Sequence, residues 1–499
     1  MPPPVPTVGQ PQDLREVVQK ILTGARAAVM LRLAAQTFSW VSTFIVVRFI
    51  SQHDYGLNTM LEAPMELMLL VSTLGLDVAL VQSRKLEAQA LRSTFGWLLL
   101  LNLALFLAYF LGGPLLAAYF REPGLDALAK TLAFVFVLVP FRVIPNALLD
   151  RELKFKVRAQ IELVSAVAAA VLTLALAVAG AGVWALVAGT LANRALQAAI
   201  LMVRHPWWVR PELDLAVVRG LIAFGGAAAG ASAAALLAAK SVHFIAGPAL
   251  GAAQLGLFAL AMQFAMLPLA KLMPVIAQTL LPAFAKFQDD RPLAAHYLEK
   301  ALGIAALALF PVMIGMACVA DLFVAVVLGP HWTAAAAPLA LISLIMPLRM
   351  ITLFLRPVMI GMGRADLALK SSLTMLALVP PLAAFGVQFG VMGLVAAWLI
   401  AEPLVGMNAL RLGRGALPLS PARLARHLFP ALACVALMAG TVLGVRVAAG
   451  LEANPAGLLA AVAAGVVSYG VALRVLFPAR LADAVRLVRG RSRAPKATS

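Results

Sequence analysis

Cationic side chains recur inside long apolar stretches of this sequence, where ionisable groups are costly and usually serve a function. Five of them lie near the middle of such a stretch: Arg142, Lys240, Lys271, Arg349 and Arg356. Arg349 and Arg356 are seven residues apart, which places them two turns apart on one face of a helix. A cavity lined by such cations would attract an anion, and phosphate suits arginine because a guanidinium can donate two hydrogen bonds at once. Arg32 and Arg194 are further candidates, although each could instead extend toward lipid headgroups.

Acidic residues inside the apolar stretches are fewer, and they offer a second kind of chemistry, the binding of a coupling proton or cation. The candidates are Glu62, Glu66, Asp77 and Glu402. Glu62 and Glu66 are four residues apart and therefore share one face of a helix. An equally good interpretation is that each carboxylate neutralises a neighbouring Arg or Lys within the bundle, and the sequence leaves both open.

The composition places these charges in a membrane. Hydrophobic residues make up 63% of the 499 residues and charged residues only 12%, against about half and a quarter in soluble proteins. Only two cysteines are present, which excludes a disulfide scaffold. Motifs for nucleotide phosphates, metalloprotease zinc and a nucleophile elbow are missing, so we expect no enzyme, no cofactor and no metal site. The net charge of +18 comes from residues between apolar runs, so no nucleic-acid partner is expected.

The apolar runs predict an all-α membrane protein with about 14 transmembrane helices, since each span needs roughly 20 apolar residues. The predicted spans are 27–50, 57–82, 93–118, 127–149, 159–179, 182–203, 219–245, 253–284, 301–320, 334–360, 367–388, 391–410, 428–448 and 456–477. About 29 of the 40 Lys and Arg residues fall in alternate connections on one side, which is cytoplasmic by the positive-inside rule. Both termini are therefore expected in the cytoplasm.

Two pairs of similar segments indicate an internal duplication. Gly182-Val183-Trp184-Ala185-Leu186-Val187-Ala188 resembles the segment 390–396, and Tyr55-Gly56-Leu57 resembles Leu255-Gly256-Leu257. Two six-helix pseudo-repeat lobes plus two C-terminal helices are therefore predicted. The predicted parts are a cytoplasmic N-terminal segment 1–24, an N-lobe 25–204, a cytoplasmic linker 205–218, a C-lobe 219–412, two helices in 427–477 and a basic cytoplasmic tail 478–499.

Five motifs in order make the chain resemble the polysaccharide flippases of the multidrug/oligosaccharidyl-lipid/polysaccharide exporter superfamily. They are Val47 to Leu57 at the first helix junction, Leu74 to Gln82 at the end of the second helix, Pro145 to Phe155 after the fourth, Leu281 to Phe284 with Gln288 to Asp290 after the eighth, and Gly361 to Asp366 after the tenth. Gln52 stands where the family usually has Pro, and Thr73 replaces an Asp.

The resemblance implies fourteen helices in two lobes, and alternating-access transfer of an undecaprenyl-pyrophosphate-linked glycan across a bacterial inner membrane. The product would be a surface polysaccharide such as O-antigen or exopolysaccharide. Membrane lipids, a polysaccharide polymerase and glycosyltransferases of the same pathway are the partners expected.

Three alternative functions remain for this sequence. A cation-coupled multidrug exporter of the same superfamily would prefer an acidic cavity. A membrane-embedded polymerase or ligase would need a sizeable outer loop with polar catalytic residues. A purely structural scaffold would not explain charges at membrane depth.

Overall fold

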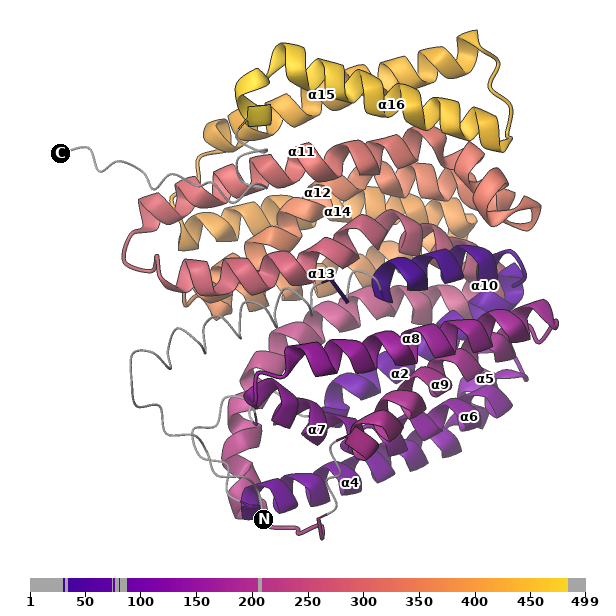
Figure 1. Ribbon diagram of the computed structural model, residues 1–499, viewed down its shortest axis with the longest axis vertical. Coiled ribbons are helices and arrows are strands. Elements are labelled where there is room, and N and C mark those ends of the chain that lie inside the picture. Colours follow the sequence, from indigo (N-terminus) through magenta and orange to yellow (C-terminus); the bar gives the residue numbers. More distant parts are fainter. Residues whose placement is uncertain are drawn as a thin grey trace. The chain divides into compact units, whose positions relative to one another are not determined.

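The computed structural model is helical, and no strand occurs in the residues that it describes (Figure 1). The described residues are 30–31, 35–73, 75–76, 80, 88–204 and 209–482. Backbone only is described for 215–232, 271, 274–275, 277–279 and 281–282. The chain divides into two compact units, Met1–Ala233 and Ala234–Ser499, called unit 1 and unit 2 below. The all-α class expected from the sequence is confirmed.

Unit 1 is a bundle of packed helices. Its described helices are Ala35–Val47, α2 (Gln52–Thr73), α4 (Ala88–Leu111), α5 (Gly113–Phe120), α6 (Leu125–Leu138), α7 (Pro140–Arg151), α8 (Phe155–Val178) and α9 (Val183–Arg204). Ser51 caps α2, because its hydroxyl accepts the backbone N–H of Asp54 at 3.0 Å and donates to the Asp54 carboxylate at 2.6 Å. This arrangement satisfies an N–H that the helix itself leaves without an acceptor.

Proline divides two of the predicted spans. The third, 93–118, consists of α4 and the separate helix α5, which begins after Gly112 with Pro114 in its first turn. The fourth, 127–149, consists of α6 and α7, and Pro140 begins α7. Proline has no N–H to donate to the preceding turn, but it fits the first turn of a new helix. The apolar pattern continues through both breaks and therefore did not reveal them.

Unit 2 contains the remaining helices. They are the C-terminal part of α10 (Leu215–Ala285), α11 (Arg291–Phe323), the π-turn η1 (Val324–Leu328), η2 (Pro330–Ala335), α12 (Ala336–Gly361), α13 (Ala365–Gly386), η3 (Val387–Phe389), α14 (Gly390–Ala416), α15 (Pro421–Ala448) and α16 (Pro455–Leu476). The last two lie side by side and pack against α11 (Figure 1). The Tyr469 hydroxyl donates to the Leu307 carbonyl at 2.7 Å and ties α16 to α11. These are the two C-terminal helices predicted to follow the repeat.

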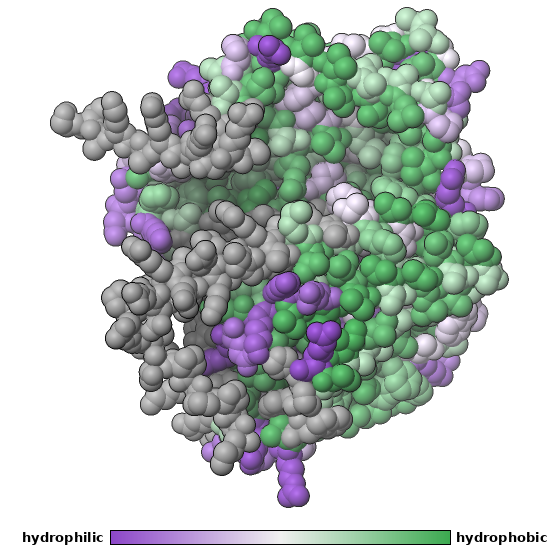
Figure 2. Space-filling view, viewed as in Figure 1, coloured by the Kyte–Doolittle hydropathy of each residue, from purple (hydrophilic) through white to green (hydrophobic). Residues whose placement is uncertain are grey.

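The outer faces of the helices are apolar. On α16, for example, Leu459, Val466 and Val475 are 68–69% exposed, and hydrophobic residues cover much of the visible described surface in Figure 2. Such exposure would be unfavourable in water and is expected against lipid. Among the described residues, ten helical stretches are long and apolar enough to cross a membrane. The protein is therefore a multi-pass membrane protein.

A helix break recurs at corresponding positions of the two units. The predicted seventh and eighth spans are both part of α10, but the helix is interrupted at Gly251, where φ is 78° and ψ is 172°. Gly251 is 200 residues beyond Ser51, which precedes α2. The same offset separates Tyr55-Gly56-Leu57 from its predicted counterpart, so the break agrees with the duplication. Glycine adopts the positive φ without the steric penalty of a Cβ.

A contact across the bundle is repeated as well. In unit 1, a Cβ added to Gly182 (φ +55°) would lie 3.0 Å from Oδ1 of Asp54. In unit 2, a Cβ added to Gly390 (φ +71°) would lie 3.8 Å from Oε1 of Gln254. Asp54 and Gln254 are 200 residues apart, and the two glycines are 208 apart. Each unit thus packs the turn before its sixth helix against the start of its second, as expected for two pseudo-repeat lobes.

Candidate functional site

The charged candidates are distributed over both units. Arg32 and Asp77 lie outside the described residues, and for Lys271 only the backbone within α10 is described. The others divide by unit, with Arg142, Arg194, Glu62 and Glu66 in unit 1, and Lys240, Arg349, Arg356 and Glu402 in unit 2.

Arg349 of α12 and Glu402 of α14 form a buried ion pair in unit 2. Nη1 of Arg349 lies 3.1 Å from Oε2 and 3.4 Å from Oε1 of the carboxylate. The side chains are 11% and 1% exposed. A charge buried in an apolar bundle is tolerated when an opposite charge is this close. The pair is the neutralising arrangement that the sequence left open for Glu402.

An aromatic and a sulfur-bearing side chain complete the surroundings of Arg349. Its guanidinium carbon lies 5.7 Å from the centroid of the Trp398 ring, within the range of a cation–π interaction. Trp398 is four residues before Glu402 and therefore lies on the same face of α14. Nη1 of Arg349 is also 3.6 Å from Sδ of Met375 on α13. Arg356, two turns further along α12, interacts electrostatically with Arg349, as their shared helix face predicts.

Unit 1 brings Arg142 and Arg194 together without such a partner. Arg142 lies on α7 and Arg194 on α9, and the two helices pack against each other. Among ionisable groups, Arg194 acts most strongly on Arg142. In the part of the chain that the structure describes, neither side chain forms an ion pair or a side-chain hydrogen bond, and Nε of Arg142 is buried without a partner. Two half-buried cations therefore lie close enough to repel.

The acidic candidates of α2 lie near Arg194. Glu66 and then Glu62 are the charged groups that act on Arg194 most strongly, and α2 packs against α9. Glu62 also accepts a hydrogen bond from Nδ2 of Asn58 at 2.9 Å, one turn earlier in α2. The two carboxylates share a helix face, as their spacing predicts. Their negative charge offsets part of the repulsion between Arg142 and Arg194, although neither carboxylate forms an ion pair with either guanidinium.

Arg158 is a cation of this region that the sequence interpretation missed. The predicted span 159–179 leaves it in the preceding connection, but α8 begins at Phe155 and includes it. Its guanidinium pairs with Asp150 and, at 3.0 Å, with Glu162. The spacing of Arg158 and Glu162, four residues on one helix, is the signal that could have revealed the pair. Both Arg158 and Glu162 interact electrostatically with Arg142.

Lys240 lies apart from both arginine groups in the chain, on α10. It is half-buried and interacts electrostatically with His243 less than one turn away. The sequence made Lys240 a candidate only because it lies near the middle of a predicted span.

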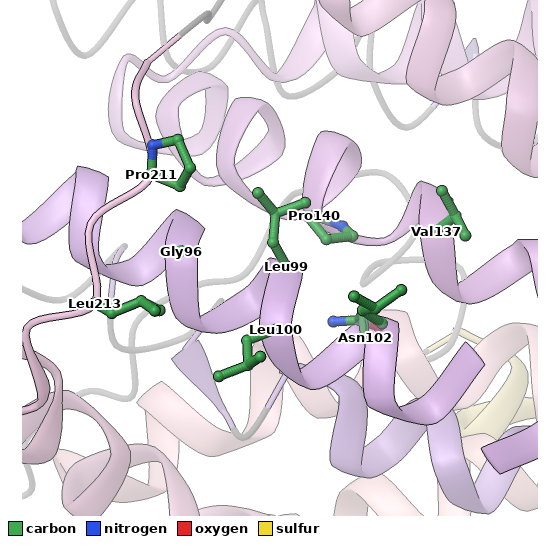
Figure 3. Close-up of a pocket in the computed structure, with 9 residues that line it drawn as sticks. Gly96, Leu99, Leu100, Asn102, Val137, Pro140, Pro211 and Leu213 are labelled. Carbon is green, nitrogen blue, oxygen red and sulfur yellow. The ribbon is translucent and has the colours of Figure 1, made fainter. Parts of the chain in front are cut away.

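A cavity in unit 1 has a different character. It measures about 340 Å³ and opens between α4, α6, α7 and the segment 209–214 (Figure 3). Its lining is apolar apart from Asn102, whose Nδ2 donates to the carbonyls of Ser72 and Leu98, each at 2.9 Å. None of the charged candidates lines this cavity. Its walls suit hydrocarbon rather than a charged group.

Comparison with known proteins assigns the family. Residues 45–337, more than half of the chain, match the family described as polysaccharide biosynthesis protein. The chain belongs to this family. The resemblance inferred from the five motifs is thereby confirmed. The first four motifs lie within the matched residues 45–337 of this family member.

Individual relatives agree with the assignment. The family member is 27% identical over 388 residues to the lipopolysaccharide biosynthesis protein WzxC of Escherichia coli (strain K12), covering 77% of this chain and 79% of that protein. A solved structure of the lipid II flippase MurJ in an inward closed conformation aligns with a TM-score of 0.73 at 12% identity, over 92% of this chain and all of that one. An inward-facing MATE multidrug transporter of the MOP superfamily aligns with a TM-score of 0.57 at 15% identity, over 80% of this chain and 98% of that one. The chain therefore shares the fold of MOP-superfamily transporters.

Proposed function

We propose that this protein is a flippase that moves undecaprenyl-pyrophosphate-linked oligosaccharide repeat units across a bacterial inner membrane by alternating access. The transferred units would be polymerised into a surface polysaccharide such as O-antigen or exopolysaccharide. Family membership and the fold shared with a lipid II flippase support this proposal. The observation that carries it is the pair Arg142 and Arg194, two half-buried cations that form no ion pair with any residue that the structure describes.

The chemistry of these cations suits the proposed cargo. A pyrophosphate diester carries two negative charges and several acceptor oxygens, and each guanidinium offers five N–H donors in a planar fork. Removing cations from water is costly, and an anionic headgroup would offset that cost when it binds. The remaining basic candidates are proposed to contact the cargo at some stage of transfer. Arg349, which is paired with Glu402, would contact only the sugars, and the others would contact the pyrophosphate or the sugars: Arg32, Lys240, Lys271 and Arg356. The proposed coupling residues are Glu62, Glu66, Asp77 and Glu402.

The proposed orientation places both termini in the cytoplasm. It follows from the excess of Lys and Arg in alternate connections, since cytoplasmic segments retain positive charge. The proposed parts remain the lobes 25–204 and 219–412 with the linker 205–218 between them. Glycosyltransferases would supply the cargo on the cytoplasmic side, and a polymerase would consume it on the outer side.

The proposal differs from two alternatives by particular features of the chain. A cation-coupled drug exporter shares the fold, but a site for cationic drugs favours carboxylates, whereas Arg142 and Arg194 are positive. A polymerase or ligase would need polar catalytic residues on an outer loop. On the side proposed to be outer, the α8–α9 connection is only Ala179–Gly182, and η3 links α13 directly to α14. The protein is accordingly proposed to move its substrate without making or breaking a covalent bond.

Reconstituted vesicles test the proposal. The purified chain is placed in vesicles that carry a radiolabelled polyprenyl-pyrophosphate-linked trisaccharide, and a lectin column or a glycosidase on the outside reports sugars that have crossed. We expect the protein to increase the accessible fraction from half toward completion, and protein-free vesicles to stay at half. Equal accessibility with and without the protein, together with efflux of a cationic dye, would instead support the exporter.

A further inference from the structure

The two units share a short motif whose structural setting is duplicated. Pro140-Phe141-Arg142 recurs as Pro347-Leu348-Arg349, at an offset of 207 residues. Pro140 opens α7 and Pro347 lies inside α12, which are corresponding helices of the two units. The offset agrees with the 208 residues that separate Gly182 from Gly390. Arg142 and Arg349 are therefore corresponding residues.

The residue that faces each of these arginines corresponds as well. Arg194 lies twelve residues after Gly182, and Glu402 lies twelve residues after Gly390, with no gap between the aligned segments. These residues lie on α9 and α14, and α9 packs against α7 as α14 packs against α12. One pair of positions thus holds Arg and Arg in unit 1 but Arg and Glu in unit 2.

This single difference in sign changes what each position can do. In unit 2 the carboxylate of Glu402 lies 3.1 Å from Nη1 of Arg349, so the pair is neutral and this Nη1 already has a partner within the protein. In unit 1 the facing residue is a second cation. The described part of the chain places no carboxylate oxygen within 4.0 Å of Arg142 or Arg194, although Glu62, Glu66 and Glu162 act on them from further away.

The buried Nε of Arg142 adds a second, independent observation. It has no hydrogen-bond partner, and buried donors are almost always satisfied by the protein, by water or by a ligand. The nearby cation Arg158 does not compete for a ligand in the same way, because Asp150 and Glu162 already pair with it. Arg142 and Arg194 differ from Arg158 because neither has a carboxylate partner among the described residues.

We propose that Arg142 and Arg194 form the phosphate-binding site of this protein, and that the Arg349–Glu402 pair is its neutralised counterpart, which binds no phosphate. The identity of the ligand rests on the proposed function: the site would take the pyrophosphate of the lipid-linked cargo. A phospholipid headgroup carries the same phosphate chemistry and is the other source to be distinguished. Recognition of phosphate is therefore assigned to unit 1 alone. The phosphate of the cargo would stay bound to this unit from the start of transport to its end.

One substitution converts unit 1 to the arrangement of unit 2. Arg194→Glu would give Arg142 a carboxylate partner at a position where unit 2 already accommodates an Arg/Glu pair, so the variant is expected to fold. Arg142→Gln/Arg194→Gln removes both cations without adding a negative charge. The matched control is Arg411→Gln/Arg414→Gln, which removes the same charge from two exposed arginines at the end of α14.

Calorimetric titration of the full chain in neutral detergent measures binding, with geranylgeranyl pyrophosphate and inorganic pyrophosphate as probes. We expect Kd for both to rise at least about tenfold in Arg194→Glu and in Arg142→Gln/Arg194→Gln, the loss expected for charged hydrogen bonds. The control should retain the wild-type Kd. Unchanged affinity in both site variants would overturn the assignment, as would an equal loss in the control, because attraction would then reflect overall charge.

Two further measurements separate the sources and the two proposals. Nanodiscs of phosphatidylcholine with or without phosphatidylglycerol show whether an anionic headgroup competes with the pyrophosphate probe; competition would identify a headgroup as a ligand of the same site, and its absence would identify the cargo. The vesicle assay then tests transport by the same variants. Normal transport by Arg194→Glu would refute the site and leave the flippase standing. Probe binding that depends on Arg142 and Arg194, in a wild-type protein that moves no glycan, would support the site and refute the flippase.

Discussion

The side-chain amide of Gln288 donates to the main-chain carbonyl of Gly361 at 2.7 Å. This bond joins two of the motifs that identified the family, the one after α10 and the one after α12. In unit 1, Nη1 of Arg151 donates to the carbonyl of Leu80 at 2.9 Å and joins the two preceding motifs in a similar way. The motifs therefore hold helix ends together in both units. These two hydrogen bonds give the motifs a role in packing the helix ends within each unit, not in binding a substrate.

Replacing Gln288 should weaken the packing of these two helix ends modestly. Gln288→Ala removes one hydrogen bond, which is worth about 1 kcal/mol. We expect a lower apparent midpoint of thermal unfolding in detergent, measured by tryptophan fluorescence. Asp289→Ala is the control, because this exposed neighbour forms no side-chain hydrogen bond or ion pair with the described residues. An equal shift in both variants would show that the amide bond adds nothing.

Gly182 should tolerate alanine less well than its neighbour Gly180. Both have positive φ, +55° and +80°, so alanine at either position is strained by about 1–2 kcal/mol. Only at Gly182 would the new Cβ also meet the Asp54 carboxylate, 3.0 Å away, while nothing lies within 4 Å at Gly180. Thermal unfolding should therefore rank Gly182→Ala below Gly180→Ala. A reversed order would contradict the packing of this turn against α2.

The sequence predicted the helices well because apolar length and charge clusters delimit them directly. The break at Gly251 fell between two predicted spans, since a polar or glycine-containing junction interrupts the apolar run there. The internal duplication was also visible, because Gly182 and Gly390 each open a helix with nearly the same letters. The separate helices α5 and α7 were missed, because Gly112-Gly113-Pro114 and Pro140 interrupt the helix without making the apolar run polar.

The pairing of charges could not be predicted in the same way. Depth in a span indicates that a charge is costly, but its partner depends on which helices pack and how each is rotated. Arg349 and Glu402 are 53 residues apart, and the sequence listed them for different roles. Arg142 and Arg194 are separated by a similar distance, and only the packing of α7 on α9 brings them together. Arg158 was assigned to a connection because α8 begins four residues before its predicted start.

The buried pair of Arg349 and Glu402 should be strongly coupled in stability. Glu402→Gln alone leaves a guanidinium uncompensated in the bundle, which typically costs about 3–5 kcal/mol. Replacing both residues by Met removes the charges together and should cost much less, since apolar replacements of buried ion pairs are often tolerated. The measurement compares the apparent unfolding midpoints of Arg349→Met, Glu402→Met and Arg349→Met/Glu402→Met. Additive losses would mean that the two charges do not stabilise each other.

Labelling of single cysteines tests the proposed orientation. The helix α15 has 28 residues, which at 1.5 Å per residue exceeds a hydrocarbon core of about 30 Å. Its two ends must therefore reach opposite sides if it spans the membrane. Arg414 precedes it in the chain and Glu452 follows it, and both are exposed. With positive residues cytoplasmic, Glu452→Cys should react with a membrane-impermeant maleimide in intact spheroplasts. Arg414→Cys should react only after permeabilisation.

The native thiols of Cys318 and Cys434 are buried, so the unsubstituted chain should give little background. Labelling of Arg414→Cys in intact spheroplasts, with protection of Glu452→Cys, would reverse the orientation and place the basic segments outside.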